Sequence, residues 1–149
     1  MADRFVNDYL LYLLARASSE VSAQFHQRLK THGLQVAEWR VLASLSDGDG
    51  MTIGELAARA LQRQPTMTKI ITRMAGAGLV ERRPDGSDRR KVRIFITGDG
   101  RRRVDDALAD AKAHEQEVLA DYNPTEAAQM KSILRALLDR NGASPREDL

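Results

Sequence analysis

The sequence has 149 residues, 42% of them hydrophobic and 30% charged, with a formal net charge of +2, which suits one domain with a small core. It contains no cysteine, and this excludes disulfides, zinc sites built on thiolates and thiol redox sensing. The three histidines lack metal-ligand spacing, and the early apolar run at residues 9–15 is too short to span a membrane. Because no secretory pattern is present, we expect a cytoplasmic protein that needs no cofactor or metal.

Two helices are predicted in the first third of the chain. Apolar residues recur at spacings of three and four through residues 4–31, which predicts one long helix, and the glycine after His32 ends it. A second helix is predicted over residues 36–46, because the Asp/Gly sequence that follows stops it. The apolar faces of the two helices contain Leu10, Leu14, Ala17, Val21 and Phe25, and Trp39, Leu42 and Leu45, respectively.

A helix-turn-helix pattern follows. Thr52 and Glu55 have the spacing of a capping box, which predicts a short helix to about residue 61. After a connector at residues 62–64, Pro65 stands at the first position of a helix that reaches residue 75 or 77. The outer face of this second helix is polar and basic, as in a helix that reads DNA.

A β-hairpin and two helices are predicted after that pattern. Residues 79–83 and 91–96 alternate in polarity around a polar loop, and the charges of the second strand suit an unpaired sheet edge. A long helix is predicted over residues 100–122 and a last one, capped by Asn123, over residues 125–140. A small winged-helix unit has too little surface to bury the apolar stripes of all the terminal helices. We therefore expect these stripes to pack against a second copy of the chain.

Positive charge is concentrated between residues 59 and 103. This segment contains thirteen Lys or Arg and four Asp or Glu, a net charge of +9, whereas the rest of the chain has a net charge of −7. A helix followed by a hairpin with an arginine-rich tip can enter a DNA groove and bind phosphates. The predicted fold is therefore mainly α with a small β-hairpin wing: a winged helix-turn-helix core with terminal dimerisation helices.

Six short motifs, in this order and spacing, carry a resemblance to a known family; they lie at residues 34–42, 52–57, 66–74, 78–82, 88–90 and 96–100. Through them the chain resembles the MarR family of transcriptional regulators over nearly its whole length. The resemblance implies a single domain over residues 1–149, with the winged helix-turn-helix at 34–98 and the dimerisation helices at 1–33 and 99–141. It also implies a homodimer, usually a repressor, whose DNA binding is weakened by a small and often aromatic acidic ligand.

The DNA contacts are predicted on the recognition helix and in the wing. Residues near the start of a recognition helix meet base edges or phosphates. In the family an Asp-x-Arg element, here Asp88 and Arg90, places the arginine in the minor groove while the aspartate orients it, and narrow A/T-rich stretches of that groove favour an inserted arginine. The alternatives are a solvated helix face and a solvated hairpin tip, and residues 101–103 suit either a phosphate contact or solvent. The predicted contacts are Gln64, Pro65, Thr66, Thr68, Lys69 and Arg73, with Asp88, Arg89, Arg90 and Lys91 in the wing.

Two positions of the recognition helix depart from the family pattern. Lys69 stands where the family usually has arginine, and Thr72 stands where it usually has aspartate. Because lysine lacks the planar guanidinium fork that binds guanine through two hydrogen bonds, we expect a different base preference near Lys69.

The resemblance also implies an effector cleft between the winged helix and the dimerisation helices. An aromatic wall and a cation would suit an aromatic acid there. The plainer interpretations are that Trp39 is a core residue, Arg40 a salt-bridge partner and His26 a surface residue. The candidate effector-binding residues are Tyr12, Arg16, His26, Trp39 and Arg40.

The predicted function is sequence-specific regulation of transcription by a homodimer on a pseudo-palindromic operator in double-stranded DNA, with a possible small-molecule effector and no membrane association. Enzymatic activity is disfavoured, because the chain has no cysteine nucleophile, no Gly-rich phosphate loop and no cluster of metal ligands. Two alternatives stay open: a winged-helix module that binds protein, and a DNA-binding protein that responds to no ligand.

Overall fold

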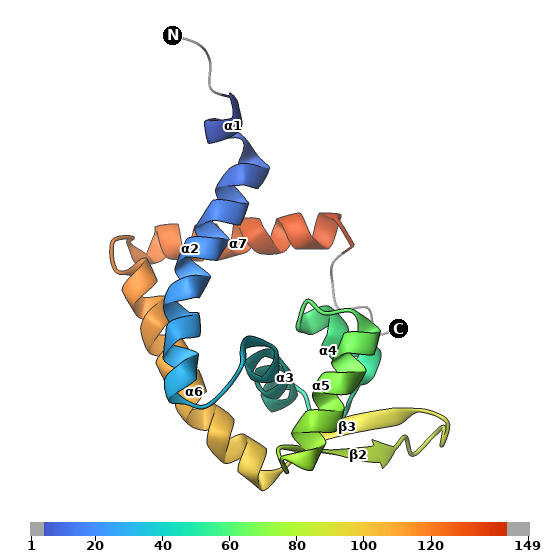
Figure 1. Cartoon of the computed structure of the whole chain (residues 1–149). Coiled ribbons are helices and arrows are strands. Elements are labelled where there is room, and N and C mark those ends of the chain that lie inside the picture. The colour runs from blue at the N-terminus through green and yellow to red at the C-terminus, as the bar shows by residue number, and fades with distance from the viewer. Residues whose placement is uncertain (1–4, 143–149) are drawn as a thin grey trace.

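The computed structural model of the chain describes residues 5–142. Figure 1 shows α2 and α6 side by side, α3 between this pair and the α4–α5 unit, and the β2–β3 hairpin extending beyond α5. The elements in chain order are α1 (Phe5–Asp8), α2 (Leu10–Thr31), α3 (Val36–Asp47), β1 (Met51–Thr52), α4 (Ile53–Arg59), α5 (Gln64–Gly76), β2 (Val80–Pro84), β3 (Val92–Ile96), α6 (Gly98–Leu119) and α7 (Pro124–Arg140).

The first predicted helix is divided in two. The backbone of Tyr9 is extended, with φ −71° and ψ 127°, and this residue separates the short α1 from α2. The predicted start at residue 4 lies outside the described residues. The end of α2 is as expected, since Gly33 has φ +65° and its N–H donates to the Lys30 carbonyl oxygen at 3.2 Å.

Local capping signals place the other helix starts closely. Thr52 and Glu55 form the predicted capping box, with both side-chain-to-backbone distances at 3.2 Å. Asn123 caps α7, and its Oδ1 accepts from the Glu126 N–H at 2.8 Å. The recognition helix α5 begins one residue earlier than predicted, so Pro65 occupies the second helical position, where its missing N–H is also harmless.

The hairpin is part of a three-stranded sheet in the order β1-β3-β2. Met51 pairs with Ile94 in β3, and Arg83 of β2 pairs with Arg93. The prediction that β3 is an unpaired edge is therefore wrong, because β1 covers that side. A strand of two residues has no periodicity that a sequence pattern can reveal.

One core connects the sheet to the helices. Gly100 shows how closely α6 approaches the residue before β2: a Cβ at Gly100 would lie 2.2 Å from the Leu79 carbonyl oxygen, so no larger side chain fits. The predicted core residues Leu42 and Leu45 are fully buried, whereas Trp39 is half-buried at its margin. The largest fully buried side chains are Leu29, Leu42, Leu45, Leu56, Met67, Ile71, Met74 and Ile94.

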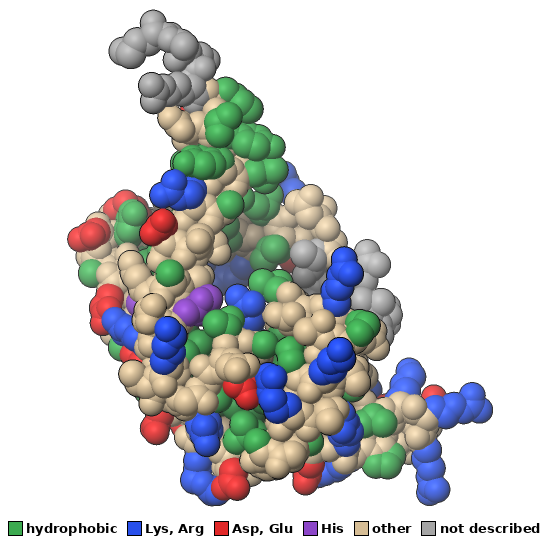
Figure 2. Space-filling view, in the orientation of Figure 1, with side chains coloured by type: hydrophobic (Ala, Val, Ile, Leu, Met, Phe, Trp, Pro, Cys, Tyr) green, Lys and Arg blue, Asp and Glu red, His purple; other side chains and the backbone are tan. Residues whose placement is uncertain are grey.

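The outermost helices leave apolar side chains uncovered. No residue of α7 is buried, and an ion pair of 3.0 Å between Lys131 and Glu115 joins it to α6. Figure 2 shows hydrophobic side chains gathered over α1 and the first part of α2 as well. Within residues 5–142 no helix is long and apolar enough to cross a membrane. The exposed apolar residues of these helices, together with Tyr9 between α1 and α2, are Phe5, Val6, Leu10, Leu11 and Leu13, and Met130, Ile133, Leu134, Leu137 and Leu138.

Candidate nucleic-acid interface and the adjoining pocket

The outer face of α5 is exposed, while its inner face anchors it in the core through four buried side chains (Met67, Ile70, Ile71 and Met74). The hydroxyl of Thr68 donates to the Gln64 carbonyl oxygen at 3.1 Å, and the hydroxyl of Thr72 donates to the Thr68 carbonyl oxygen at 2.9 Å. Lys69 lies between these threonines, exposed. All the predicted contacts on this helix, namely Gln64, Pro65, Thr66, Thr68, Lys69 and Arg73, are solvent-accessible.

Two arginines tie this face to neighbouring elements. Arg73 Nη2 donates to Gln35 Oε1, before α3, at 3.0 Å, so its guanidinium is oriented by the protein. Arg82 Nη2, from β2, donates to Thr72 Oγ1 at 2.7 Å. The sequence interpretation did not include Arg82, because its contact depends on how the hairpin folds back on α5. Arg82 is a further basic group beside the recognition helix.

The wing tip is held by backbone contacts. Asp88 Oδ1 accepts from the Arg90 backbone N–H at 3.0 Å, and the Lys91 N–H donates to the Asp88 carbonyl oxygen at 3.0 Å. Asp88 thus shapes the turn instead of binding the Arg90 guanidinium. Arg89, Arg90 and Lys91 are exposed, and Figure 2 shows basic side chains projecting from the hairpin.

A partly buried ion pair supports the base of the wing. Arg93 Nε donates to Asp85 Oδ2 at 3.0 Å, and its Nη1 donates to the Gly50 carbonyl oxygen at 2.8 Å. The hydrogen bond from the Ser87 backbone, and next the one from Arg93, lower the pKa of the Asp85 carboxyl. The sequence pattern suggested that the Arg93 charge keeps a sheet edge from pairing, whereas in the structure Arg93 binds Asp85 and the Gly50 carbonyl oxygen.

The recognition helix and the wing meet around one groove. A hollow of about 500 Å³ lies between the start of α4, the start of α5 and the base of the wing. It brings Gln64 together with Arg90 and Lys91, which are far apart in sequence. Residues 52–54 and Val92 form the rest of its lining. The predicted contacts at the start of α5 and at the wing base therefore share one surface.

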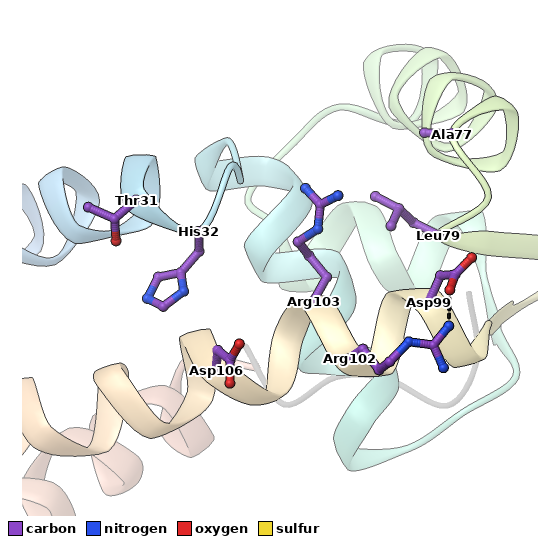
Figure 3. A pocket seen from close by; sticks show the side chains of 8 residues that line it. All are labelled: Thr31, His32, Ala77, Leu79, Asp99, Arg102, Arg103 and Asp106. Atoms are coloured by element: carbon purple, nitrogen blue, oxygen red, sulfur yellow. Dashed lines mark hydrogen bonds and ion pairs between the residues drawn. The ribbon is translucent and has the colours of Figure 1, made fainter.

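The arginines at the start of α6 line a different, polar pocket of about 490 Å³ (Figure 3). Arg102 forms an ion pair with Asp99, and Arg103 Nη1 approaches the Gly33 carbonyl oxygen at 3.4 Å. Arg101 is exposed. Because the positive and negative side chains around this pocket balance one another, it has no net charge that would favour an anionic or a cationic ligand.

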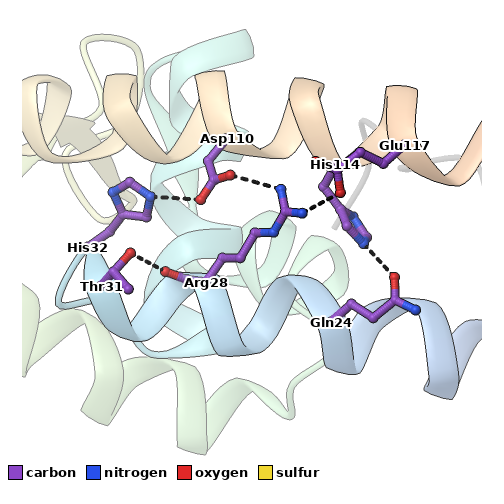
Figure 4. A network of polar contacts seen from close by, with 7 residues as sticks. All are labelled: Gln24, Arg28, Thr31, His32, Asp110, His114 and Glu117. Atoms are coloured by element: carbon purple, nitrogen blue, oxygen red, sulfur yellow. Dashed lines mark hydrogen bonds and ion pairs between the residues drawn. The ribbon is translucent and has the colours of Figure 1, made fainter.

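A polar network clamps α2 to α6 (Figure 4). Arg28 Nη1 binds Asp110 Oδ1 at 3.0 Å, and its Nη2 binds Glu117. His32 Nε2 lies 3.1 Å from Asp110 Oδ2. The His32 contact, and next the Arg28 hydrogen bond, lower the pKa of the Asp110 carboxyl. These contacts fix the end of α2, from which the chain enters α3.

Farther along the same helix pair, aromatic side chains surround a pocket of about 280 Å³ between α2, α3 and α6. The Phe25 ring meets Trp39 edge-on, with centroids 5.1 Å apart, and stacks on His114 at 5.8 Å. His114 is buried, with Nε2 3.0 Å from Gln24 Oε1. The remaining lining residues are Val21, Ser22, His26, Arg40 and Ala111.

Three of the five effector candidates line this pocket, namely His26, Trp39 and Arg40. Burial, and next the charge of Arg40, lower the pKa of His26, so its imidazole is neutral near pH 7. Tyr12 and Arg16 do not line it; Arg16 Nη1 donates to the Tyr12 hydroxyl at 3.0 Å on α2. Sequence reasoning missed Phe25 as a pocket residue and His114 altogether, since α6 reaches the site only through the tertiary fold.

The comparisons agree with this architecture. The family model described as "MarR family" matches residues 32–91, which include the helix-turn-helix and the wing tip. The crystal structure of a MarR family transcriptional regulator from Silicibacter pomeroyi is 47% identical, with a TM-score of 0.82 over 92% of this chain and 98% of that chain.

Two further relatives are named for their regulation. The homoprotocatechuate degradative operon repressor of Escherichia coli is 28% identical over 97% of each chain. BpsR of Bordetella bronchiseptica, whose DNA binding is regulated by 6-hydroxynicotinic acid, is 28% identical, with a TM-score of 0.73 over 85% of this chain and 96% of that chain. The fold, the basic groove and these likenesses together show that the chain belongs to the MarR family of DNA-binding transcriptional regulators.

Proposed function

We propose that this regulator is a homodimeric repressor that binds a pseudo-palindromic operator and leaves it when an aromatic acid occupies the pocket between α2, α3 and α6. The single observation that carries the DNA-binding part is the groove shared by Gln64, Arg90 and Lys91. It lets one subunit place the start of α5 against base edges while the wing arginines reach the neighbouring phosphates or minor groove. We infer that a protein with this function acts in the cytoplasm.

Dimerisation follows from the uncovered helices. The apolar residues of α1, the start of α2 and α7 have no cover within the described chain, and a second copy would bury them. A twofold dimer would present two α5 helices to two half-sites about one helical turn apart. Residues 34–98 would then contact DNA, while 1–33 and 99–141 would set the distance between the two units.

The effector assignment rests on the chemistry of the pocket. Phe25 and Trp39 supply aromatic faces and edges, and Arg40 supplies a cation for a carboxylate. The relatives named for homoprotocatechuate degradation and for 6-hydroxynicotinic acid point to the same class of ligand. We infer that small aromatic acids are the ligands to be tried first.

Selection of bound duplexes from a random pool, repeated with 6-hydroxynicotinate and homoprotocatechuate, tests the proposal. The expected outcome is a palindrome with half-sites one turn apart, released by at least one acid. Affinity should also fall by about 0.9 log unit per log unit of salt for each neutralised phosphate. Failure to enrich any duplex would refute the DNA-binding function and favour a winged-helix module that binds protein. Enrichment without release by either acid would leave a DNA-binding protein insensitive to these ligands.

A further inference from the structure

Arg40 joins the aromatic pocket to the turn between α4 and α5. Its side chain lines the pocket, and its Nη1 donates to the Ala60 carbonyl oxygen at 3.3 Å. Ala60 is the C-cap of α4, so this carbonyl has no partner within its own helix. Among residues 5–142 the guanidinium has no other hydrogen bond and no acidic partner. One side chain therefore reaches both the pocket and the helix-turn-helix.

The turn that Arg40 contacts is strained. Leu61 has φ +57° and is the only non-glycine residue with positive φ among those described. Its side chain is 74% exposed, so packing does not hold it in this conformation. Backbone hydrogen bonds hold it instead. The Leu61 N–H donates to the Ala58 carbonyl oxygen at 3.3 Å, and the Gln62 N–H donates to the Ala57 carbonyl oxygen at 2.9 Å. A strained conformation persists only while its surroundings impose it, and the Arg40 hydrogen bond is one of those constraints.

The charge of the pocket makes this hydrogen bond open to competition. Arg40 is the only side chain of fixed charge among the lining residues, and the neighbouring His26 is neutral near pH 7 because burial lowers its pKa. A carboxylate forms a charge-assisted hydrogen bond with guanidinium that is stronger than the one to a neutral carbonyl. An anion in the pocket would thus draw Arg40 away from Ala60.

We propose that Arg40 is the positioning residue that couples the pocket to the recognition helix. Without ligand it holds the Ala60–Leu61 turn and, through it, the start of α5 at Gln64. An aromatic carboxylate takes the guanidinium, the turn relaxes, and α5 loses its DNA-binding position. The proposal rests on the effector pocket of the proposed function and adds the route by which occupancy reaches DNA.

The first test uses the full-length dimer without any ligand. Arg40→Met keeps the apolar stem and removes the donor, so it should imitate the ligand-bound state. Its affinity for the selected duplex should fall about tenfold, and amide exchange at residues 60–63 should become faster, with the dimer intact. Arg40→Lys retains a donor and should restore part of both. Wild-type affinity and unchanged exchange in Arg40→Met would overturn the proposal.

A double-mutant cycle separates coupling from loss of fold. Leu61→Gly removes the strain, so the turn should no longer depend on Arg40. In this background Arg40→Met should change DNA affinity less than about twofold. An undiminished effect would mean that Arg40 acts by another route, and the proposal would be wrong.

The second test adds 6-hydroxynicotinate, with nicotinamide as a probe that lacks the carboxylate. The acid should weaken DNA binding of the wild type and the amide should not. Leu61→Gly should bind the acid with wild-type affinity, measured by calorimetry, yet release DNA far less. A wild-type response in Leu61→Gly would overturn the coupling route. If the acid does not bind the wild type at all, that counts against the proposed effector class alone, and the ligand-free variants decide the coupling.

Discussion

Arg93 and Asp85 meet beneath the wing tip with 3.0 Å between Nε and Oδ2, and the same guanidinium reaches the Gly50 carbonyl oxygen at 2.8 Å. The Asp85 side chain is only 11% exposed, although it stands in a surface loop. Its Oδ1 also accepts from the backbone N–H of Ser87 at 3.0 Å. The loop that carries Arg89 and Arg90 is therefore fixed at its base to the segment before β1.

Removing this support should weaken DNA binding without unfolding the protein. Arg93→Met breaks both contacts, so the wing arginines would have to be ordered on binding. We expect a loss of about tenfold in affinity, the size of one or two hydrogen bonds to a charged group. Lys112→Met, which removes an exposed positive charge from α6, is the matched control and should stay near wild type. Equal losses in the two variants would show that net charge alone matters.

Arg90 is predicted to contribute at every DNA sequence. Arg90→Ala should lower the affinity for operator and unrelated duplexes alike and reduce the salt dependence by about one phosphate, about 0.9 in the logarithmic slope. Fluorescence anisotropy at several salt concentrations measures both quantities, and sedimentation confirms that the dimer persists. Near-wild-type affinity at moderate salt would contradict a groove or phosphate contact for this residue.

Sequence patterns that span only a few residues predicted the helices and strands well. The capping boxes at Thr52 and Asn123 placed two helix starts, because a cap and its partner are three residues apart. The break at Tyr9 and the two-residue β1 escaped notice, since neither carries a local pattern. Pairing of β1 with β3 joins segments more than forty residues apart in the sequence, so only the folded chain reveals it.

The site was predictable to the same extent. Residues of one helix or one hairpin, such as Lys69 and Arg90, could be proposed from sequence as exposed basic groups near a recognition helix. Contacts between distant segments could not. Arg82 with Thr72, and Arg40 with Ala60, depend on how separate elements dock. Sequence reasoning therefore named the surface but not what orients it.

Leu61 should be replaceable by glycine with a gain in stability. The left-handed conformation costs a non-glycine residue about 1 kcal/mol, and glycine avoids that cost. We expect Leu61→Gly to raise the free energy of unfolding by up to about 1 kcal/mol. Ala58→Gly, at an exposed position within α4, should lower it by a similar amount because glycine is costly inside a helix. Urea unfolding at one fixed protein concentration measures both, and a loss of stability in Leu61→Gly would contradict the strain.

The α2–α6 network should make stability depend on pH. The His32 contact and the Arg28 hydrogen bond lower the pKa of Asp110 in the folded state. A carboxyl whose pKa is lower in the folded state than in the unfolded state, where it is near 4, stabilises the fold at pH values above that unfolded-state pKa. This contribution is lost as the pH falls through the folded-state pKa. Asp110→Asn should thus be less stable than wild type at pH 7, and the difference should shrink on acidification. Asp105→Asn, exposed on the same helix, should show no such trend; a constant difference for Asp110→Asn would rule the linkage out.

Dimerisation is predicted to depend on the apolar face of α7. Ile133 is 67% exposed in the single chain, and a partner subunit would bury it. Ile133→Glu would place a charge in that interface, which costs several kcal/mol unless the charge is paired. We therefore expect monomers in sedimentation at micromolar concentration. Because one subunit offers a single α5 and a single wing, operator affinity should fall far more than affinity for a half-site. Gln129→Glu, an exposed polar position on the same helix, introduces the same charge and should leave the dimer intact. Dimers of unchanged stability in Ile133→Glu would mean that α7 does not form the interface.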